Sequence, residues 1–312
     1  MKRAAALAAM LALLPPPAFA HGDGLPISPL EIWHHWSFDP LVCIPLLLVH
    51  WLYGRGVIRA WKQADIGRIV PVWRAACFFA GEVVLVAALI APLDPLGETL
   101  LSAHMAQHIL LTAVAPPLLV LGIPVIAWTW ALPPGWRRVG TTPLARGLGA
   151  LADVLSRPLL AGFVATAVMW AWHAPALFEA ALVDEAIHTV EHISFFAGAV
   201  LAWRAALSPY ASAVAAAGAT LVAFMAGGML GGVMCLAPAP LYDWYGNRAL
   251  LWGMSPLEDQ QLAGLLMWVV AGGIYLVAFA VLAFRAADPA GSGRSRPSHG
   301  IIRASTSSRS MK

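Results

Sequence analysis

Seven apolar stretches restrict the fold of this 312-residue chain more than any other feature. Each approaches the roughly 20 residues that a helix needs to cross a bilayer. Charged residues make up only 11% of the chain, against roughly 25% in an average soluble domain, so the chain cannot cover a water-facing surface. No stretch shows the period-2 alternation of a membrane barrel. The sequence therefore predicts an all-α integral membrane protein, a bundle of seven transmembrane helices, at 39–56, 73–92, 100–121, 158–176, 186–205, 213–235 and 261–284.

The Lys and Arg residues predict the orientation of this bundle. Beyond residue 20, sixteen of them fall in the loops and tail of one side, and a single one, Arg248, falls on the other. Basic loops stay in the cytoplasm, so we expect the mature N-terminus outside and the C-terminus inside. Residues 118–132 are also apolar, but an extra span there would move the later arginines outside. We expect a kinked continuation or an interfacial segment instead.

Both ends of the chain differ from the apolar middle. Residues 1–20 have a basic start, an apolar run and the small-residue sequence AFA, which is typical of a cleavable signal peptide. Residues 288–312 are rich in Ser, Arg and Gly, which predicts a disordered cytoplasmic tail. The membrane domain then spans 21–287. The three cysteines allow one disulfide, between Cys43 and Cys235, without requiring it.

The predicted spans place eight of the ten histidines near the outer face. His104 and His108 lie four residues apart at the start of the third span, and His188 and His192 have the same spacing at the start of the fifth. Residues at this spacing share one helix face, so each pair can offer two imidazoles to one metal ion. Met105 lies within the first pair and Glu191 beside the second. Imidazole suits copper, zinc and iron, and thioether shifts the preference towards Cu(I).

Other polar residues are weaker candidates for a metal site. His173 ends the fourth span between interfacial tryptophans, where a hydrogen bond explains it as well as a metal does. His21 would become the first residue after signal cleavage, and its α-amine and imidazole would then chelate copper, with His34 or His35 completing the shell. His50 and Glu82 lie at similar depth in the first two spans, where a structural pair or a proton relay would satisfy both.

Three alternative functions fit parts of this pattern. HTVEH (188–192) matches the inverted zinc-peptidase motif, with Glu191 as the catalytic base, but three fixed positions in five residues arise readily by chance. Facing histidines on two helices also ligate b-type haem, whereas a c-type site would require C-x-x-C-H, which the chain lacks. A metal permease would use His50 and Glu82 as a deeper relay. It should also carry polar groups through the inner half of the bundle, where this sequence has few.

Four motifs in order resemble the CtaG family, seven-helix membrane proteins implicated in assembling caa(3)-type cytochrome c oxidase. They are HMAQHILLTAVAPPLLVLGIP (104–124), WHAPALFEAAL (172–182), HTVEHISFFAGAVLAW (188–203) and PLEDQQLAGLLMW (256–268). The likeness runs from about Trp33 to Phe284. It implies a role in copper insertion, with the two His pairs and His173 as ligand candidates. It also places Asp259 and Gln260, of the DQQ motif, at the outer mouth of the last span.

Together these observations predict a non-enzymatic, multi-pass protein of the cell (inner) membrane that aids oxidase assembly. We expect copper at a His cluster facing the periplasm, with His104, His108, His188, His192, His173, Met105 and His21 as candidate ligands. Glu191, Glu82, His50 and Asp259 are candidate supporting or relay residues. Besides the bilayer, the expected partners are cytochrome c oxidase subunits, with a periplasmic copper chaperone as a candidate donor and no nucleic acid. Haem handling and metal permeation remain the alternatives.

Overall fold

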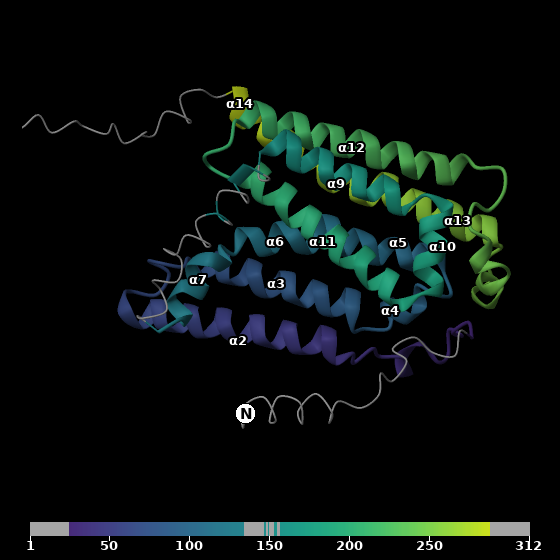
Figure 1. Cartoon of the computed structure of the whole chain (residues 1–312), viewed down its shortest axis with the longest axis horizontal. Helices are drawn as coiled ribbons and strands as arrows, with labels where there is room; N and C mark the ends of the chain where they lie inside the picture. The colour runs from purple at the N-terminus through teal and green to yellow at the C-terminus, as the bar shows by residue number, and fades with distance from the viewer. Residues whose placement is uncertain (1–24, 134–146, 148, 150–152, 155–156, 288–312) are drawn as a thin grey trace, which may run out of the picture.

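The computed structural model is a bundle of long helices that lie roughly side by side (Figure 1). It describes residues 25–133, 147, 149, 153–154 and 157–287, and in these residues it contains helices and no strand. The predicted signal peptide, His21 and the predicted tail lie outside the described residues. The helices that build the bundle are α2 (Pro40–Gln63), α3 (Val72–Leu89), α5 (Leu101–Ile109), α6 (Ala115–Leu121), α9 (Pro158–Trp172), α10 (Pro175–Val183), α11 (Glu185–Leu207), α12 (Ala213–Leu236), α13 (Pro256–Leu265) and α14 (Gly272–Ala287).

Within the described residues, six helices are long and apolar enough to cross a membrane, and a bent pair makes up to seven. Two of the six contain a π-helical turn: Leu110–Val114 joins α5 to α6, and Leu266–Ala271 joins α13 to α14. The all-helical fold that the sequence predicts is thus confirmed, with six to seven candidate membrane spans. The orientation of the bundle stays a prediction.

The fourth predicted span, 158–176, is broken. α9 ends at Trp172, α10 begins at Pro175, and their axes differ by 73°. Proline lacks the N–H that would continue the helix, and its ring keeps the preceding residue out of the α region. Ala174 is accordingly extended. Because of this break, His173 lies just after the last residue of α9, at its C-cap.

The segment after α6 forms the short helix α7 (Pro124–Ala131), which packs on α2. Its eight residues span roughly 12 Å and are too short to cross a bilayer, which agrees with the expected kinked continuation or interfacial segment. A Cβ on Gly56 of α2 would lie 1.9 Å from the Ala127 carbonyl oxygen, so only glycine allows this contact. Arg55 and Arg59 donate hydrogen bonds to the carbonyl of Ala131 and satisfy the end of α7.

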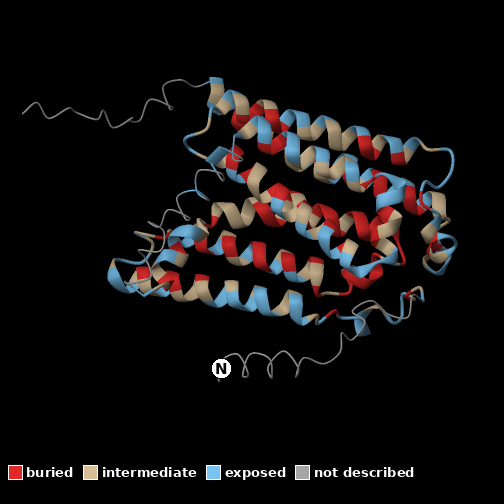
Figure 2. Ribbon diagram, in the orientation of Figure 1, coloured by how far each residue is buried: buried red, intermediate tan, exposed pale blue. Residues whose placement is uncertain are grey.

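The buried residues face the bundle interior, mostly on α3, α5, α11 and the inner side of α12 (Figure 2). The outer faces of α2 and α12 expose large apolar side chains, such as Leu47, Trp51 and Met229, which suits contact with lipid. α12 and α13 approach backbone to backbone, because a Cβ on Gly231 would lie 2.6 Å from the Gly264 carbonyl oxygen. All three cysteines are free, so the Cys43–Cys235 disulfide that the sequence allows is not formed.

Candidate metal centre

The first His pair lies at the start of α5, whose N-terminus is held by another helix. Asp259, in the first turn of α13, accepts hydrogen bonds from the backbone N–H groups of Leu101 (2.7 Å) and Ser102 (3.1 Å) and from the Ser102 hydroxyl. These N–H groups have no partner within a helix. The first two turns of α5 are therefore fixed, and they carry His104 and His108, whose ring centroids lie 4.3 Å apart.

The second His pair lies at the start of α11. The side chain of Asp184 caps this helix by accepting from the N–H groups of Ala186 and Ile187. One turn further on, His188 and His192 lie with ring centroids 4.1 Å apart. Because α5 and α11 both begin at the same end of the bundle, the two His pairs lie at similar depth (Figure 1).

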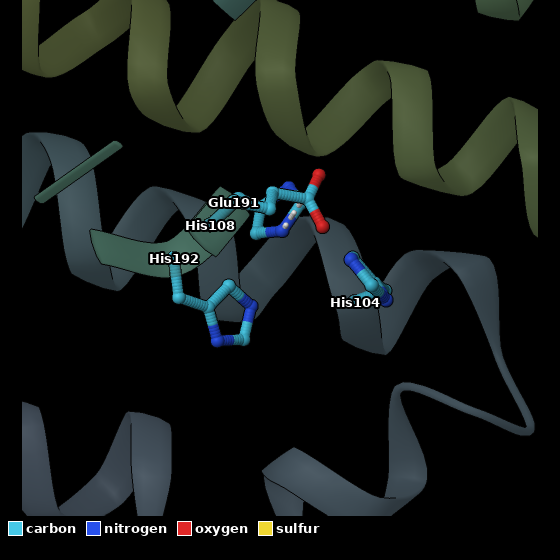
Figure 3. Close-up of side chains that lie close together, drawn as sticks. All are labelled: His104, His108, Glu191 and His192. Atoms are coloured by element: carbon cyan, nitrogen blue, oxygen red, sulfur yellow. Dashed lines mark ion pairs between the residues drawn. The ribbon is translucent and has the colours of Figure 1, made fainter. Parts of the chain in front are cut away.

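Four side chains from these two helices converge on one point (Figure 3). His104, His108, Glu191 and His192 each offer a ligand atom, and these atoms all lie within 4.8 Å of one another. Three of the four residues are at least 96% buried, and His192 is partly buried. Three imidazoles and a carboxylate at this spacing are a donor set that can hold Cu²⁺, Zn²⁺ or Fe²⁺.

Glu191 and His108 carry buried polar atoms that make no hydrogen bond. Neither oxygen of Glu191 and neither ring nitrogen of His108 has a hydrogen-bond partner. Their nearest approach, His108 Nε2 to Glu191 Oε1, is 3.8 Å, which is too long for a hydrogen bond. Buried polar groups are otherwise almost always hydrogen-bonded. A cation bound between them would supply the missing partner for both residues.

His188 and His173 border this group without belonging to it. The His188 ring lies 5.4 Å from that of His104, and the His173 ring lies 5.9 Å from that of His108. Nε2 of His173 instead faces the sulfur of Met105 at 3.3 Å. The five imidazoles therefore form one contiguous cluster, and donor atoms of three of them converge with a Glu191 oxygen.

The other candidate residues lie elsewhere. His50 Nδ1 lies 2.8 Å from Glu82 Oε2, on the α2–α3 side of the bundle, with the His50 side chain 60% exposed and Glu82 buried. His34 and His35 are exposed in the segment before α2. Asp259 holds the start of α5, the helix that carries His104 and His108, through its bonds to Leu101 and Ser102.

Two buried glutamines also support the cluster: Gln260, to which the DQQ motif already pointed, and Gln107, which sequence reasoning missed. Gln260 accepts from the N–H of Leu241 and donates to the carbonyls of Met234 and Ala239, which ties the loop after α12 to α13. Gln107, within HMAQH, is fully buried and donates to the Ala88 carbonyl and to Asp94. The sequence signal available for Gln107 was a polar amide within the histidine motif of a predicted membrane span.

Two tyrosines of the loop between α12 and α13 also reach this end of the bundle. The Tyr242 hydroxyl donates to the His173 carbonyl, and the Tyr245 hydroxyl donates to the Gly97 carbonyl. Burial, and then the negative charge of Glu191, raises the pKa of Tyr242 above its ordinary value of 10.0, and burial with nearby acids raises the pKa of Tyr245 as well. Both phenols therefore stay protonated and keep donating.

The long apolar helices make this a multi-pass membrane protein. The imidazole and carboxylate groups that converge at one end of its bundle form a candidate metal site. The model of the cytochrome c oxidase caa3 assembly factor family (Caa3_CtaG) matches residues 51–288. This range is most of the chain, so the chain belongs to that family, which confirms the resemblance carried by the four motifs.

The comparison with curated proteins adds a partial match. A stretch of 90 residues, 29% of the chain, is 33% identical to the uncharacterized protein ML1998 of Mycobacterium leprae (strain TN). The match covers 13% of that protein, so the chain corresponds to a small part of its length. No solved structure matches the chain.

Proposed function

We propose that this protein binds a copper ion at His104, His108, His192 and Glu191 and passes it to cytochrome c oxidase during assembly of the oxidase. Copper is then cargo, and the protein is an assembly factor without a catalytic step of its own. Family membership supports the link to the oxidase. The convergent donors support the link to a metal.

The observation that carries this proposal is the pair of buried, unsatisfied groups at the centre of the cluster. Glu191 is fully buried, and neither of its oxygens is hydrogen-bonded. Burying a carboxylate without compensation is costly, and polar groups inside a membrane protein are usually functional. A bound cation offsets this cost, and the imidazoles of His108 and its neighbours complete its shell.

The chemistry of the donors suits an ion that must be released again. The converging set contains no thiolate, since Cys43, Cys77 and Cys235 lie on other helices, α2, α3 and α12. Imidazole and carboxylate ligands hold copper without the closed sulfur cage of a permanent site. Because His192 is only partly buried, it is the ligand through which a partner would reach the ion.

We propose that the cluster faces the periplasm. Its end of the bundle is opposite to Arg55, Arg59 and Arg74, which lie around α7 and the end of α6. Basic residues favour the cytoplasmic side. An outward cluster would receive copper from a periplasmic donor and deliver it to a centre in the outer part of the oxidase.

The geometry favours a single ion over haem or peptide hydrolysis. The imidazoles pack against one another with centroid separations of 4.1 to 6.2 Å, which leaves no flat slot for a macrocycle between two ligands. Glu191 is fully buried and out of reach of a peptide. For permeation, the deeper pair of His50 and Glu82 lies on other helices, away from the cluster.

The test combines metal analysis of the purified protein with oxidase activity in cells. The double variant H104N/H108N should lose bound copper and lower the copper content and activity of the oxidase, while the protein is still inserted in the membrane. The matched control is H50N, which changes a histidine on the α2–α3 side of the bundle, away from the cluster, and should leave both readouts unchanged.

Two results would contradict the proposal. Copper content of the oxidase that is unaffected by H104N/H108N would rule out delivery from this site. A Soret absorption band in the purified protein, lost in the same variant, would assign the histidines to haem instead.

A further inference from the structure

We propose that His173 and Met105 form a second metal position beside the four-residue cluster, and that this position takes Cu(I). The inference rests on the proposed function in that copper is the cargo. It adds a site of different donor chemistry, which holds the ion in its reduced state.

The hydrogen bonds of His173 fix which of its nitrogens is free. Nδ1 lies 2.8 Å from the carbonyl oxygen of Met169. A carbonyl only accepts, so Nδ1 carries the hydrogen and the neutral ring presents a lone pair at Nε2. Metal-bound histidines commonly have this arrangement, in which one nitrogen donates to a carbonyl and the other faces the metal.

The atom that faces this lone pair is another acceptor. The Met105 sulfur lies 3.3 Å from His173 Nε2, and a thioether has no hydrogen to donate. Both residues are buried, Met105 completely. Two lone pairs that face each other in an apolar interior lack a partner unless a cation lies between them. Ligand atoms at roughly 2.0–2.3 Å from one ion lie about 3.5 Å apart in tetrahedral geometry, which is close to the observed separation.

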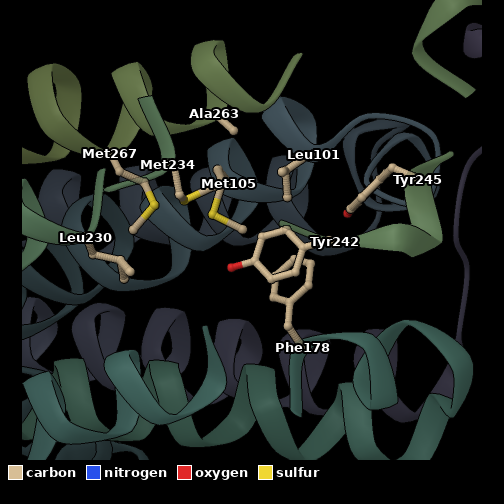
Figure 4. Packing of buried hydrophobic residues seen from close by; sticks show 9 residues of the cluster. All are labelled: Leu101, Met105, Phe178, Leu230, Met234, Tyr242, Tyr245, Ala263 and Met267. Carbon is tan, nitrogen blue, oxygen red and sulfur yellow. The ribbon is translucent and has the colours of Figure 1, made fainter. Parts of the chain in front are cut away.

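The surroundings favour a soft cation. Met105 packs in one buried cluster with Met234 and Met267, and their side chains lie beside it (Figure 4). Met234 is also fully buried, so the surroundings of Met105 contain thioethers and no charged group of this cluster. Thioether and imidazole together select Cu(I) over harder ions.

The backbone adds to this preference. His173 lies at the C-terminal end of α9, where the helix dipole presents partial negative charge and favours a cation. The Tyr242 hydroxyl holds the His173 carbonyl and limits movement of the residue. His108 lies next to His173, at a ring separation of 5.9 Å, so an ion can move between the two positions by exchanging neighbouring ligands.

The experiment uses the full chain in detergent, loaded anaerobically with Cu(I) against bicinchoninate as a competing chelator. Metal analysis gives the stoichiometry, and X-ray absorption at the copper edge identifies sulfur neighbours. We expect about two Cu(I) per chain with sulfur in the shell, falling to about one without sulfur in M105L. The control M229L changes an exposed methionine of α12 and should match the unmodified chain.

A second variant separates this inference from the proposed function. In H108N/H192N we expect about one Cu(I), with the sulfur neighbour retained. Sulfur-free copper that M105L does not change would overturn the second position and leave the proposed function standing. If H108N/H192N has the same copper content and the same sulfur neighbours as the unmodified chain, the proposed function is overturned and the second position stands. No copper at all in the unmodified chain would overturn both.

Selenomethionine labelling provides a test that needs no substitution. It therefore remains usable if the M105L variant does not fold. A copper neighbour at the selenium edge is expected in the labelled, Cu(I)-loaded chain. Its absence would overturn the position.

Discussion

Asp259 offers a direct test of how the cluster is positioned. Its two carboxylate oxygens accept three hydrogen bonds from the first two residues of α5, and the side chain is 1% exposed. It also lies in the first turn of α13. The positive N-terminal ends of two helices therefore stabilise one carboxylate.

The isosteric substitution Asp259→Asn should destabilise the protein by about 3–4 kcal/mol. Asparagine keeps one oxygen and places an amide group against a backbone N–H. One hydrogen bond to a charged acceptor is then lost, which costs about 2 kcal/mol, and the other two weaken by about 1 kcal/mol each. Because the change also loosens the turn that carries His104 and His108, metal affinity should fall roughly 10- to 100-fold, as for other residues that orient ligands.

The assay measures the free energy of unfolding and the metal affinity of the same detergent-solubilised samples. The control is Asp243→Asn, the same chemical change at an exposed aspartate in the preceding loop. If Asp259→Asn loses stability but binds metal as before, the start of α5 does not position the histidines. If both variants equal the unmodified chain, the hydrogen bonds to Asp259 contribute nothing measurable.

Two further predictions concern buried charge. Glu191→Leu should stabilise the metal-free protein by about 1–3 kcal/mol at about pH 8, because it removes a buried carboxylate with no hydrogen bond, and should weaken metal binding; a less stable metal-free variant would show that Glu191 has a structural partner instead. A double-mutant cycle with His50→Leu and Glu82→Leu should give a coupling energy of about 0.6–1.7 kcal/mol, as for polar pairs between membrane helices. Metal loading should stay unchanged, and reduced loading in either single variant would favour a relay role for this pair.

The membrane made most of this fold predictable from sequence. A bilayer demands helices of a fixed apolar length, so six candidate spans and the bent pair could be located from sequence, with ends that differ by up to seven residues. The break at 172–175 was missed, because the fourth span was predicted to run through Pro175, although a proline disfavours helical backbone at the preceding residue, Ala174. The π-helical turns were not predictable, since they depend on packing. In one case, Trp203 donates to the Thr112 carbonyl within the turn that follows His108.

The candidate site was predictable in its parts and not in its assembly. Four-residue spacing indicates that His104 and His108 share a face, and the same holds for His188 and His192. Which histidine of the second pair turns towards the first depends on the rotation of α11 against α5, and spacing carries no information about that. The Met105–His173 contact joins residues 68 apart in sequence. It depends on the end of α9 lying beside α5.

The nearby helix ends act in opposite ways on a cation at the two proposed metal positions. They repel it at the four-residue cluster and attract it at His173. α5 and α11 both begin within two turns of His104, His108 and His192, and the partial positive charge of their N-termini opposes a cation there. Glu191 offsets this repulsion at the cost of a buried carboxylate. At His173 the end of α9 favours a cation, and neutral donors suffice. A cation would therefore be held at the first position mainly by the charge of Glu191, so protonating or displacing that one group would release it.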